Sequence, residues 1–337
     1  MGVYKIRVKL LKLVISKLKK QAFIFVLALL LCGNLFSQQY PWFTQYRSNL
    51  YMFNPGFCGT KRFVDLRLFY RNQWTGYKGA PKTYAASFNM RLSEGKVGAG
   101  IFFFNDEIGP FKNSYGSATL AYHLKFDDVE LSIGFQGSYM QQIFNSSKLT
   151  LQNHIDQSIN IGAVDKTTAF DGSFGLVLIN DRFFLGVGAL NMLGKEMIHY
   201  SGDPFFKGKY KNEASYSVNA GYNYAENPNY TFENSLIALY TSGVPIYVDY
   251  TLRLHINKIL LTGFSIRFKD AVAIHLGFNI KNQFQVAYSY DVLTSPLRKY
   301  QKGSHDISIV FSSDLGRNQV KRGFNGRFLK QKFQYLL

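Results

Sequence analysis

The chain has 337 residues, enough for one large domain or two ordinary ones, and no linker or low-complexity tract divides it. Aromatic residues make up 17% of the sequence, with 29 glycines and only 8 prolines, a composition that favours β-strands over helices. The mean hydropathy is close to zero, which argues against a helical membrane protein. A net charge of +18 suggests a nucleic-acid-binding protein. No basic helix or aromatic-basic RNA motif accompanies the charge, so we set nucleic-acid-binding proteins aside.

The first 37 residues are typical of a secretory signal peptide. Seven basic residues and no acidic one precede an apolar run of about eleven residues, 22–32, which is too short to span a bilayer as a helix. We expect cleavage after Ser37. Cys32 could instead be a lipidation site, but a leucine precedes it where a small residue is required. Cleavage leaves Cys58 as the only cysteine, so an intramolecular disulfide is excluded.

The rest of the chain alternates apolar and polar residues with period two. In one segment Val272, Ile274 and Leu276 alternate with Ala273 and His275. Successive side chains of a strand point to opposite faces, and about ten tilted residues cross a bilayer. The alternation therefore predicts an all-β fold, a transmembrane antiparallel β-barrel of about 14 strands. The predicted strands are 62–71, 82–92, 96–106, 114–126, 129–143, 168–179, 182–192, 213–225, 230–241, 245–256, 258–269, 271–281, 283–293 and 304–313.

Four parts of the chain are expected: the signal peptide, an irregular segment, the barrel and a tail. Residues 38–60 show no clean alternation and are predicted to pack in or under the barrel, which spans 61–313. The tail, 314–337, has six basic residues and no acidic one after its first position, so it is either solvated or in contact with a periplasmic partner.

The connections between predicted strands differ in length. Several are two-residue hairpin turns, such as Lys269-Asp270 and Lys281-Asn282, whereas 144–167 and 193–212 are long. Outer-membrane barrels have short periplasmic turns and longer extracellular loops, so the long connections are predicted to face outward.

Charged residues of both signs fall on the polar face of the predicted strands. Charges enclosed in a barrel must pair or stay hydrated, so we expect a lumen joined by ion pairs rather than a pathway of one sign. A general diffusion pore is the less favoured alternative, because fourteen strands enclose a modest lumen that side chains and the N-terminal segment could fill. The predicted lumen charges are Asp65, Arg67, Arg71, Arg91, Glu130, Asp171, Asp249, Arg253, His255, Arg267 and Asp291.

No catalytic or metal-binding motif stands out. The six histidines are dispersed, and neither a His-x-x-x-His pair, a Cys-x-x-Cys pair nor a Gly-x-Ser-x-Gly elbow occurs. Asp249 with His255, or His275 with Asp291, could share an inward face, as in outer-membrane hydrolases. Structural ion pairs are the favoured interpretation, so we predict a protein that is not an enzyme and has no cofactor or metal.

Short motifs follow one another in order along the chain. The first four are Phe43-Thr44-Gln45-Tyr46, Asn54-Pro55-Gly56-Phe57-Cys58-Gly59-Thr60, Tyr70-Arg71-Asn72-Gln73-Trp74-Thr75-Gly76 and Gly79-Ala80-Pro81-Lys82-Thr83. The later ones are Gly98-Ala99-Gly100, Asn105-Asp106-Glu107-Ile108-Gly109-Pro110, Ala121-Tyr122-His123-Leu124 and Ser304-His305-Asp306-Ile307. This ordered set resembles the PorP/SprF family of the type IX secretion system of Bacteroidetes, over nearly the whole mature chain.

The resemblance implies an outer-membrane barrel that helps to secrete or anchor a large surface adhesin-like protein, in gliding or adhesion, by holding its C-terminal sorting domain. The implied partners are that adhesin, outer-membrane lipids and periplasmic ring or gliding lipoproteins, with no nucleic acid among them. The family often has Asn-Pro-Ala-Tyr-Ala-Gly where this chain has Gly56, Phe57 and Cys58, which puts any contact of the family's tyrosine in doubt. The alternative is a passive outer-membrane channel or transporter for small or hydrophobic solutes.

Two roles stay open for the motif residues. Asn54-Pro55-Gly56 is a turn signal, and Pro81 ends a connection before a strand. Either the motifs fix the N-terminal segment to the first hairpin, or Arg71, Trp74 and Tyr77 form a dock for a partner. The candidate docking or motif residues are Asn54, Pro55, Arg71, Asn72, Gln73, Trp74, Gly79 and Pro81.

Overall fold

The structure is a computed structural model, and two compact units are distinguished in it. The second, larger unit comprises Gln39–Ser242 with Ile246–Leu337. The predicted signal peptide and the basic tail lie outside the described residues. Within the described parts of the chain, no helix is long and apolar enough to cross a membrane. The described residues are 41–61, 64–92, 95–149, 162–200, 207–227, 229–281 and 283–313.

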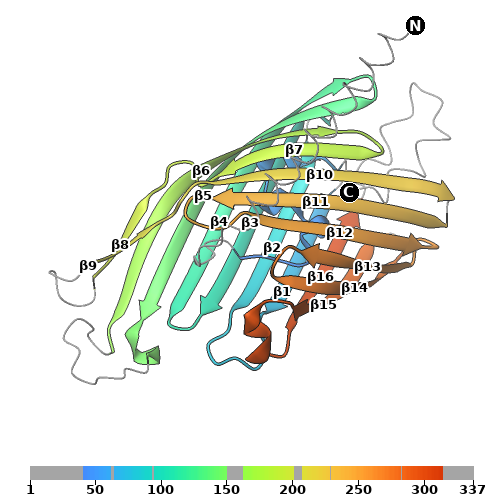
Figure 1. Cartoon of the computed structure of the whole chain (residues 1–337). Helices are drawn as coiled ribbons and strands as arrows, with labels where there is room; N and C mark the ends of the chain where they lie inside the picture. The colour runs from blue at the N-terminus through green and yellow to red at the C-terminus, as the bar shows by residue number, and fades with distance from the viewer. Residues whose placement is uncertain are drawn as a thin grey trace, which may run out of the picture. The chain divides into compact units, whose positions relative to one another are not determined.

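Fourteen antiparallel strands of the second unit close into a barrel (Figure 1). The strands are β1 (Val64–Asn72), β2 (Lys82–Leu92), β3 (Val97–Ile108), β4 (Phe111–Phe126), β5 (Val129–Asn145), β6 (Val164–Ile179), β7 (Phe183–Leu190), β10 (Ser215–Asn227), β11 (Tyr230–Thr241), β12 (Tyr247–Ile256), β13 (Leu260–Arg267), β14 (Ala271–Ile280), β15 (Phe284–Leu293) and β16 (Ser304–Ser313). Strands adjacent in this order are paired, and β1 closes the ring on β16. Each corresponds to one predicted strand, which confirms the predicted fold class.

The connection after β7 contains a second sheet that was not predicted. β8 (Glu196–Tyr200) and β9 (Lys207–Lys211) form a two-stranded antiparallel sheet, where we expected a long loop. Five residues are too few for a period-two pattern to distinguish a strand from a loop. The strand β6 also begins four residues before its predicted start, at Val164 rather than at residue 168. Short 3-10 turns are η5 (Ser146–Lys148) and η6 (Pro296–Lys299) in loops, and η1 (Tyr46–Ser48), η2 (Leu50–Met52) and η3 (Pro55–Phe57) before β1.

The connections differ between the two ends of the barrel. Because consecutive strands run in opposite directions, the four longest connections, 73–81, 146–163, 191–214 and 294–303, all lie at one end. We call this the long-loop end. The opposite, short-turn end carries the tight turns of β4–β5, at residues 127–128, and of β14–β15. The strand β1 begins and β16 ends at the short-turn end.

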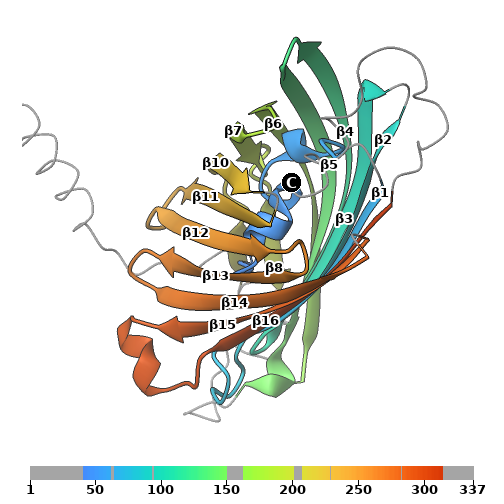
Figure 2. The same ribbon diagram turned by 90° about the vertical axis from the view of Figure 1, so that its right-hand side faces the viewer.

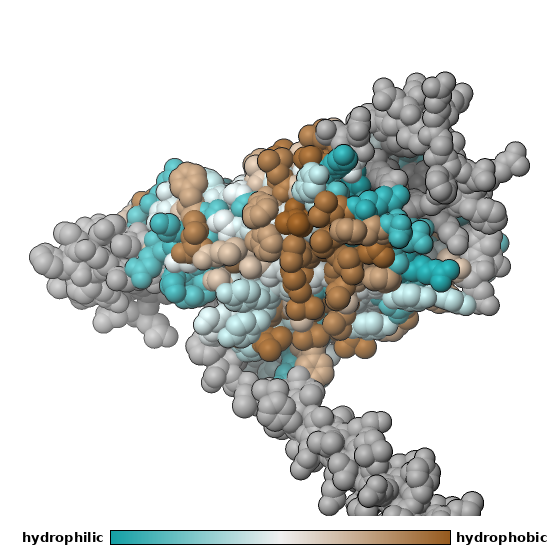
Figure 3. All heavy atoms as spheres, turned by 90° about the horizontal axis from the view of Figure 1, so that it is seen from above, coloured by the Kyte–Doolittle hydropathy of each residue, from teal (hydrophilic) through white to brown (hydrophobic). Residues whose placement is uncertain are grey.

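Outward and inward positions differ in chemistry as the alternation predicts. On β15, Val286 and Tyr288 are exposed, whereas Ala287, Ser289 and Asp291 between and after them are buried. On the face seen in Figure 3, hydrophobic residues form a band across the middle, and hydrophilic ones lie on either side of it. A band of this kind suits hydrocarbon, while closure of the barrel leaves no strand edge unpaired within it.

Candidate functional site

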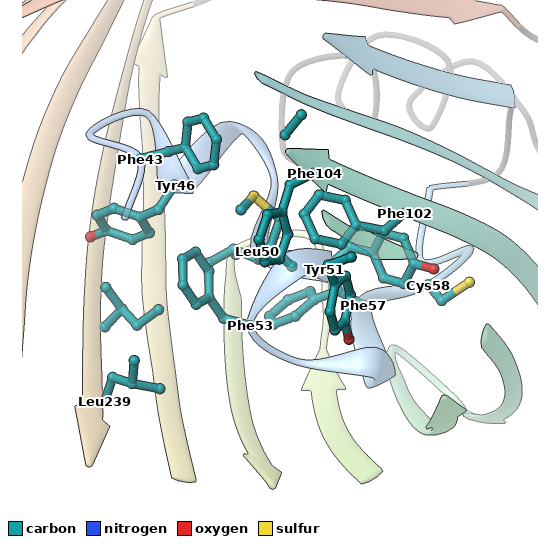
Figure 4. Close-up of a cluster of buried hydrophobic side chains, with 14 of the residues drawn as sticks. Phe43, Tyr46, Leu50, Tyr51, Phe53, Phe57, Cys58, Phe102, Phe104 and Leu239 are labelled. Atoms are coloured by element: carbon teal, nitrogen blue, oxygen red, sulfur yellow. The ribbon is translucent and has the colours of Figure 1, made fainter. Parts of the chain in front are cut away.

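Residues 41–60 lie inside the ring of strands (Figure 2). Their side chains are almost all buried, and Phe43, Tyr46 and Phe53 have no exposed surface. Figure 4 shows these aromatic side chains among residues of the barrel wall, including Phe102 and Phe104 of β3. The lumen of this barrel is therefore occupied by a segment of its own chain, which we call the plug.

The plug runs from the long-loop end of the lumen to the short-turn end. Near its start, Thr44 contacts Asp291, close to the long-loop end of β15. Near its end, the carbonyl of Gly59 accepts a hydrogen bond of 2.6 Å from Arg91 Nε, close to the short-turn end of β2. The chain then continues into β1, which begins at that same end.

The Asn54-Pro55-Gly56 turn packs against inward-facing glycines of the barrel wall. The Asn54 side chain caps the turn by accepting from Gly56 N–H at 2.8 Å, and it donates to Leu176 O of β6 at 3.2 Å. A Cβ atom at Gly175 would collide with Asn54, and one at Gly134 would collide with Pro55. The turn therefore lies against β5 and β6, whereas one of the two interpretations of the sequence expected a contact with the first hairpin.

A cluster of buried charges holds the start of the plug. Arg71 donates from Nη2 to Asp291 Oδ2 at 2.7 Å, and its Nη1 lies 3.5 Å from Asp306 Oδ2. Arg267 Nη1 lies 3.3 Å from Asp291 Oδ2. Thr44 Oγ1 donates to Asp291 at 2.7 Å, and the Thr44 N–H donates to Asp306 at 2.8 Å. Because a buried charge is costly unless it is paired, this Asp291 cluster ties the plug to the wall.

A second cluster surrounds Glu233 of β11. Arg253 donates to Glu233 Oε2 from Nη2 at 2.6 Å and to Ser48 Oγ of the plug at 2.9 Å. His255 Nε2 lies 3.2 Å from Glu233 Oε1. Arg47, on the plug rather than on a membrane-spanning strand, is also buried here. Burial lowers the pKa of the Arg47 guanidinium to about 10, and the nearby Glu233 carboxylate opposes this shift.

A third group of ion pairs lies toward the short-turn end. Arg91 Nη1 donates to Glu130 Oε2 at 2.9 Å, while its Nε holds the end of the plug. Asp65 and Arg67 pair with each other on β1. The plug is thus tied to the wall by charged side chains at both ends.

Asp249 Oδ2 lies 3.4 Å from Arg267 Nε, so all eight residues of the predicted charge network face the lumen and take part in ion pairs. They are Asp65, Arg67, Arg91, Glu130, Asp249, Arg253, Arg267 and Asp291. Asp171 is also buried, but it accepts hydrogen bonds from the backbone N–H groups of Gly172 and Leu193. Glu233 and Asp306 were not among the predicted lumen charges. Both are buried at inward positions of predicted strands, so the same alternation could have identified them.

The predicted docking residues fall into two groups. Asn54, Pro55 and Arg71 are buried in the lumen. Asn72, Gln73, Trp74, Gly79 and Pro81 lie at the end of β1 and in the following loop. Tyr77, in the same loop, is 50% exposed. Arg71 points into the Asp291 cluster, so it does not share a surface with Trp74 and Tyr77.

The β1–β2 loop is bonded to its neighbours at the long-loop end. Trp74 N–H donates to Ser304 Oγ at 3.1 Å. Thr75 N–H donates to Gly303 O at 2.8 Å, and Thr75 O accepts from Lys302 N–H at 2.7 Å. The loop and the β15–β16 connection therefore form one continuous surface.

The histidine–carboxylate pairs considered for catalysis are not formed. His275 Nε2 bonds to Ser265 Oγ, His255 approaches Glu233, and Asp291 contacts arginines. The described residues also contain no group of three or more His, Cys, Asp or Glu side chains placed to hold a metal ion. The charged side chains of the lumen form ion pairs and hydrogen bonds that hold the plug to the wall.

Several solved structures are similar to this chain. The Pseudomonas putida toluene transporter TodX is 11% identical, with a TM-score of 0.44, and the match covers 79% of this chain and 93% of that one. The Ralstonia pickettii toluene transporter TbuX is 10% identical, with a TM-score of 0.44 and coverage of 78% and 92%. At these identities and TM-scores the likeness says nothing of ligands. No curated protein sequence matches this chain.

A protein-family match covers most of the chain. Residues 35–311 match the family described as type IX secretion system membrane protein PorP/SprF. This span includes the plug and nearly all of the barrel, and it contains all the motifs on which the resemblance was based. The family is one of secretion-system membrane proteins and not a known enzyme family. The chain is therefore an outer-membrane β-barrel that belongs to the PorP/SprF family of the type IX secretion system.

Proposed function

We propose that this barrel is a non-enzymatic accessory of type IX secretion that holds the C-terminal sorting domain of a large surface adhesin-like protein, in adhesion or gliding. The observation that carries the proposal is the plug, which fills the lumen with buried side chains and joins both ends of the wall. Because the plug occupies the space through which solutes would pass, a role in holding cargo is favoured over a diffusion pathway. The cargo then meets the loops instead of the lumen.

The energetics of the plug support this role. Withdrawal of the plug would remove Thr44 from the Asp291 cluster and Ser48 from Arg253, leaving buried polar groups short of partners. It would also expose the aromatic side chains of the segment to water. Both costs favour a permanently filled barrel.

The long-loop end is the proposed cargo side, because long loops of outer-membrane barrels face the exterior. The joined surface of the β1–β2 loop and the β15–β16 connection offers Tyr77 and Tyr300, which are 50% and 69% exposed. The exposed part of the family motif thus lies where cargo would arrive. The basic tail, 314–337, follows β16 at the short-turn end and is proposed to contact periplasmic ring or gliding lipoproteins.

The test is purification of the tagged barrel from outer membranes of its own species, with mass spectrometry of the proteins that accompany it. We expect a large protein with a type IX sorting domain in near-equal amount, and its loss from a Tyr77→Ala/Tyr300→Ala variant. Ser147→Ala, in a different exposed loop, is the matched control. Recovery of the barrel alone, together with a steady open-pore current in planar bilayers, would favour the passive channel instead.

A further inference from the structure

The joined surface of the β1–β2 loop and the β15–β16 connection carries charge of one sign. Its two segments, 73–81 and 294–303, contain no aspartate or glutamate, whereas the other two long connections at this end have acidic residues beside their lysines. All of its basic side chains are exposed. We call this surface the basic rim, and it consists of Lys78, Arg298, Lys299 and Lys302 with the exposed Tyr77 and Tyr300 among them.

The charge of the basic rim has no counterpart in the described part of the chain. At the same end of the barrel, the exposed Lys112 has an acidic partner, since its Nζ lies 3.4 Å from Glu107. Among the described residues, no cation of the basic rim forms such an ion pair. Asp270 adjoins the rim, because its carbonyl accepts from Thr294 N–H at 2.8 Å, but its carboxylate lies 3.1 Å from Arg267. The rim therefore keeps its positive charge for a partner.

Hydrogen bonds hold the basic rim in one arrangement. Besides its backbone bonds to Thr75, Lys302 accepts at its carbonyl from Tyr290 Oη at 2.9 Å. Its side chain passes over the neighbouring loop, where a Cβ at Gly76 would lie 3.7 Å from Lys302 Cγ. In η6, Arg298 N–H donates to Ser295 O at 3.0 Å. A surface ordered in advance loses less conformational entropy when it binds a partner.

The cations are spread over the rim and do not converge on one point. Arg298 and Lys299 are consecutive residues of the 3-10 turn η6, so their side chains leave it about 120° apart. Lys302 lies on the other segment, over Gly76. Diverging cations match several carboxylates along a polypeptide better than they match a single phosphate group. Tyrosine and arginine, which the rim combines, are also the residues enriched at the centres of protein–protein interfaces.

We propose that the basic rim binds an acidic stretch of polypeptide in the sorting domain of the cargo, with carboxylates facing Arg298, Lys299 and Lys302. The inference rests on the proposed function and adds the chemistry by which the partner is recognised. Single exposed ion pairs contribute little, so several must act together with contacts to the two tyrosines. Salt screens charges beyond about 8 Å at physiological ionic strength, so the acidic residues must lie in contact with the rim.

The test compares variants that reverse the same amount of charge at different loops. Arg298→Glu/Lys299→Glu reverses two charges of the rim, and Arg298→Lys/Lys299→Arg keeps them. The matched control is Lys148→Glu/Lys195→Glu, which reverses two exposed lysines of the other long connections. Heat-resistant migration on gels verifies that each variant is folded.

The measurement is the amount of large sorting-domain protein that accompanies each tagged barrel from outer membranes of its own species. We expect near-equal amounts with the native barrel, the charge-keeping variant and the control. Arg298→Glu/Lys299→Glu should recover roughly tenfold less, because like charges then face each other. Free polyglutamate should release the protein from the native barrel, whereas polyserine should not. A wash at about 1 M salt, where the screening length falls to about 3 Å, should release it too.

The outcomes separate this inference from the proposed function. Equal recovery with Arg298→Glu/Lys299→Glu, or no release by polyglutamate, would overturn the acidic partner while the holding role stands. A native barrel without any large partner would overturn both. If Arg298→Glu/Lys299→Glu keeps the cargo but loses bound lipopolysaccharide, the cations serve lipid phosphate instead.

Discussion

Thr44 Oγ1 lies 2.7 Å from Asp291 Oδ1, although 247 positions separate the two residues in the sequence. One belongs to the plug and the other to the penultimate strand of the barrel. Arg71 donates to Thr44 Oγ1 at 2.6 Å and to Asp291 Oδ2 at 2.7 Å, so three distant parts of the chain meet at one point.

Removal of the central carboxylate of this cluster should destabilise the barrel. Asp291→Ala leaves Arg71 and Arg267 buried with fewer partners, which typically costs about 3–5 kcal/mol of unfolding free energy. Asp270→Ala removes a 32% exposed carboxylate from the same Arg267 and should cost less than about 1 kcal/mol. Urea unfolding in detergent micelles or liposomes measures both. Equal losses would show that the Asp291 cluster is not specially important.

A methyl group on the wall should displace the plug. In Gly175→Ala the new Cβ collides with the Asn54 side chain, so we expect a loss of about 1–3 kcal/mol and faster proteolysis of the plug. Gly137→Ala adds the same methyl to the outward face of β5, where nothing lies within 4 Å, and should behave as the native protein. Limited proteolysis of reconstituted barrels compares the two, and equal cleavage would contradict the fit of plug to wall.

The cysteine of the plug should be unreactive while the barrel is folded. Cys58, on the plug, has no exposed surface, and burial raises the pKa of its thiol to about 12. Little thiolate forms at pH 8, and no reagent reaches it, so maleimide labelling should await unfolding. Ser147→Cys, in an exposed loop, should label at once and serves as the control. Rapid labelling of Cys58 in the folded barrel would indicate that the plug leaves the lumen.

The lipid-facing register can be tested at Val286. This side chain is 42% exposed on the outer face of β15, so Val286→Arg should cost about 2–4 kcal/mol if it lies near the midplane of the bilayer. Tyr300→Arg, in an exposed connection, should cost little. Heat-resistant migration and urea titration report both, and equal stability of the Val286→Arg barrel would overturn the assigned face.

The alternation of apolar and polar residues was enough to predict the strands and to predict that their charged side chains point into the lumen. Outward positions face lipid and must be apolar, whereas inward positions can be polar. Asp249 and Arg267 could be placed inward on that ground alone. Their partners could not, since register around a closed ring depends on every turn between them. The contact of Asn54 with Gly175 could not be predicted either. The two residues are far apart in the sequence, and only the closed barrel brings them together.

The position of the Asp291 cluster has a consequence for assembly. Arg71 and Asp306 face each other across the seam where the first strand joins the last, and Asp291 lies on the strand beside it. Thr44 bonds to all three, so a residue of the plug bridges the seam from inside the barrel. The side chains on both sides of the seam therefore have all of these bonding partners only when the plug is in place. We expect docking of the plug and closure of the seam to depend on each other, so damage to either should appear as failed membrane assembly.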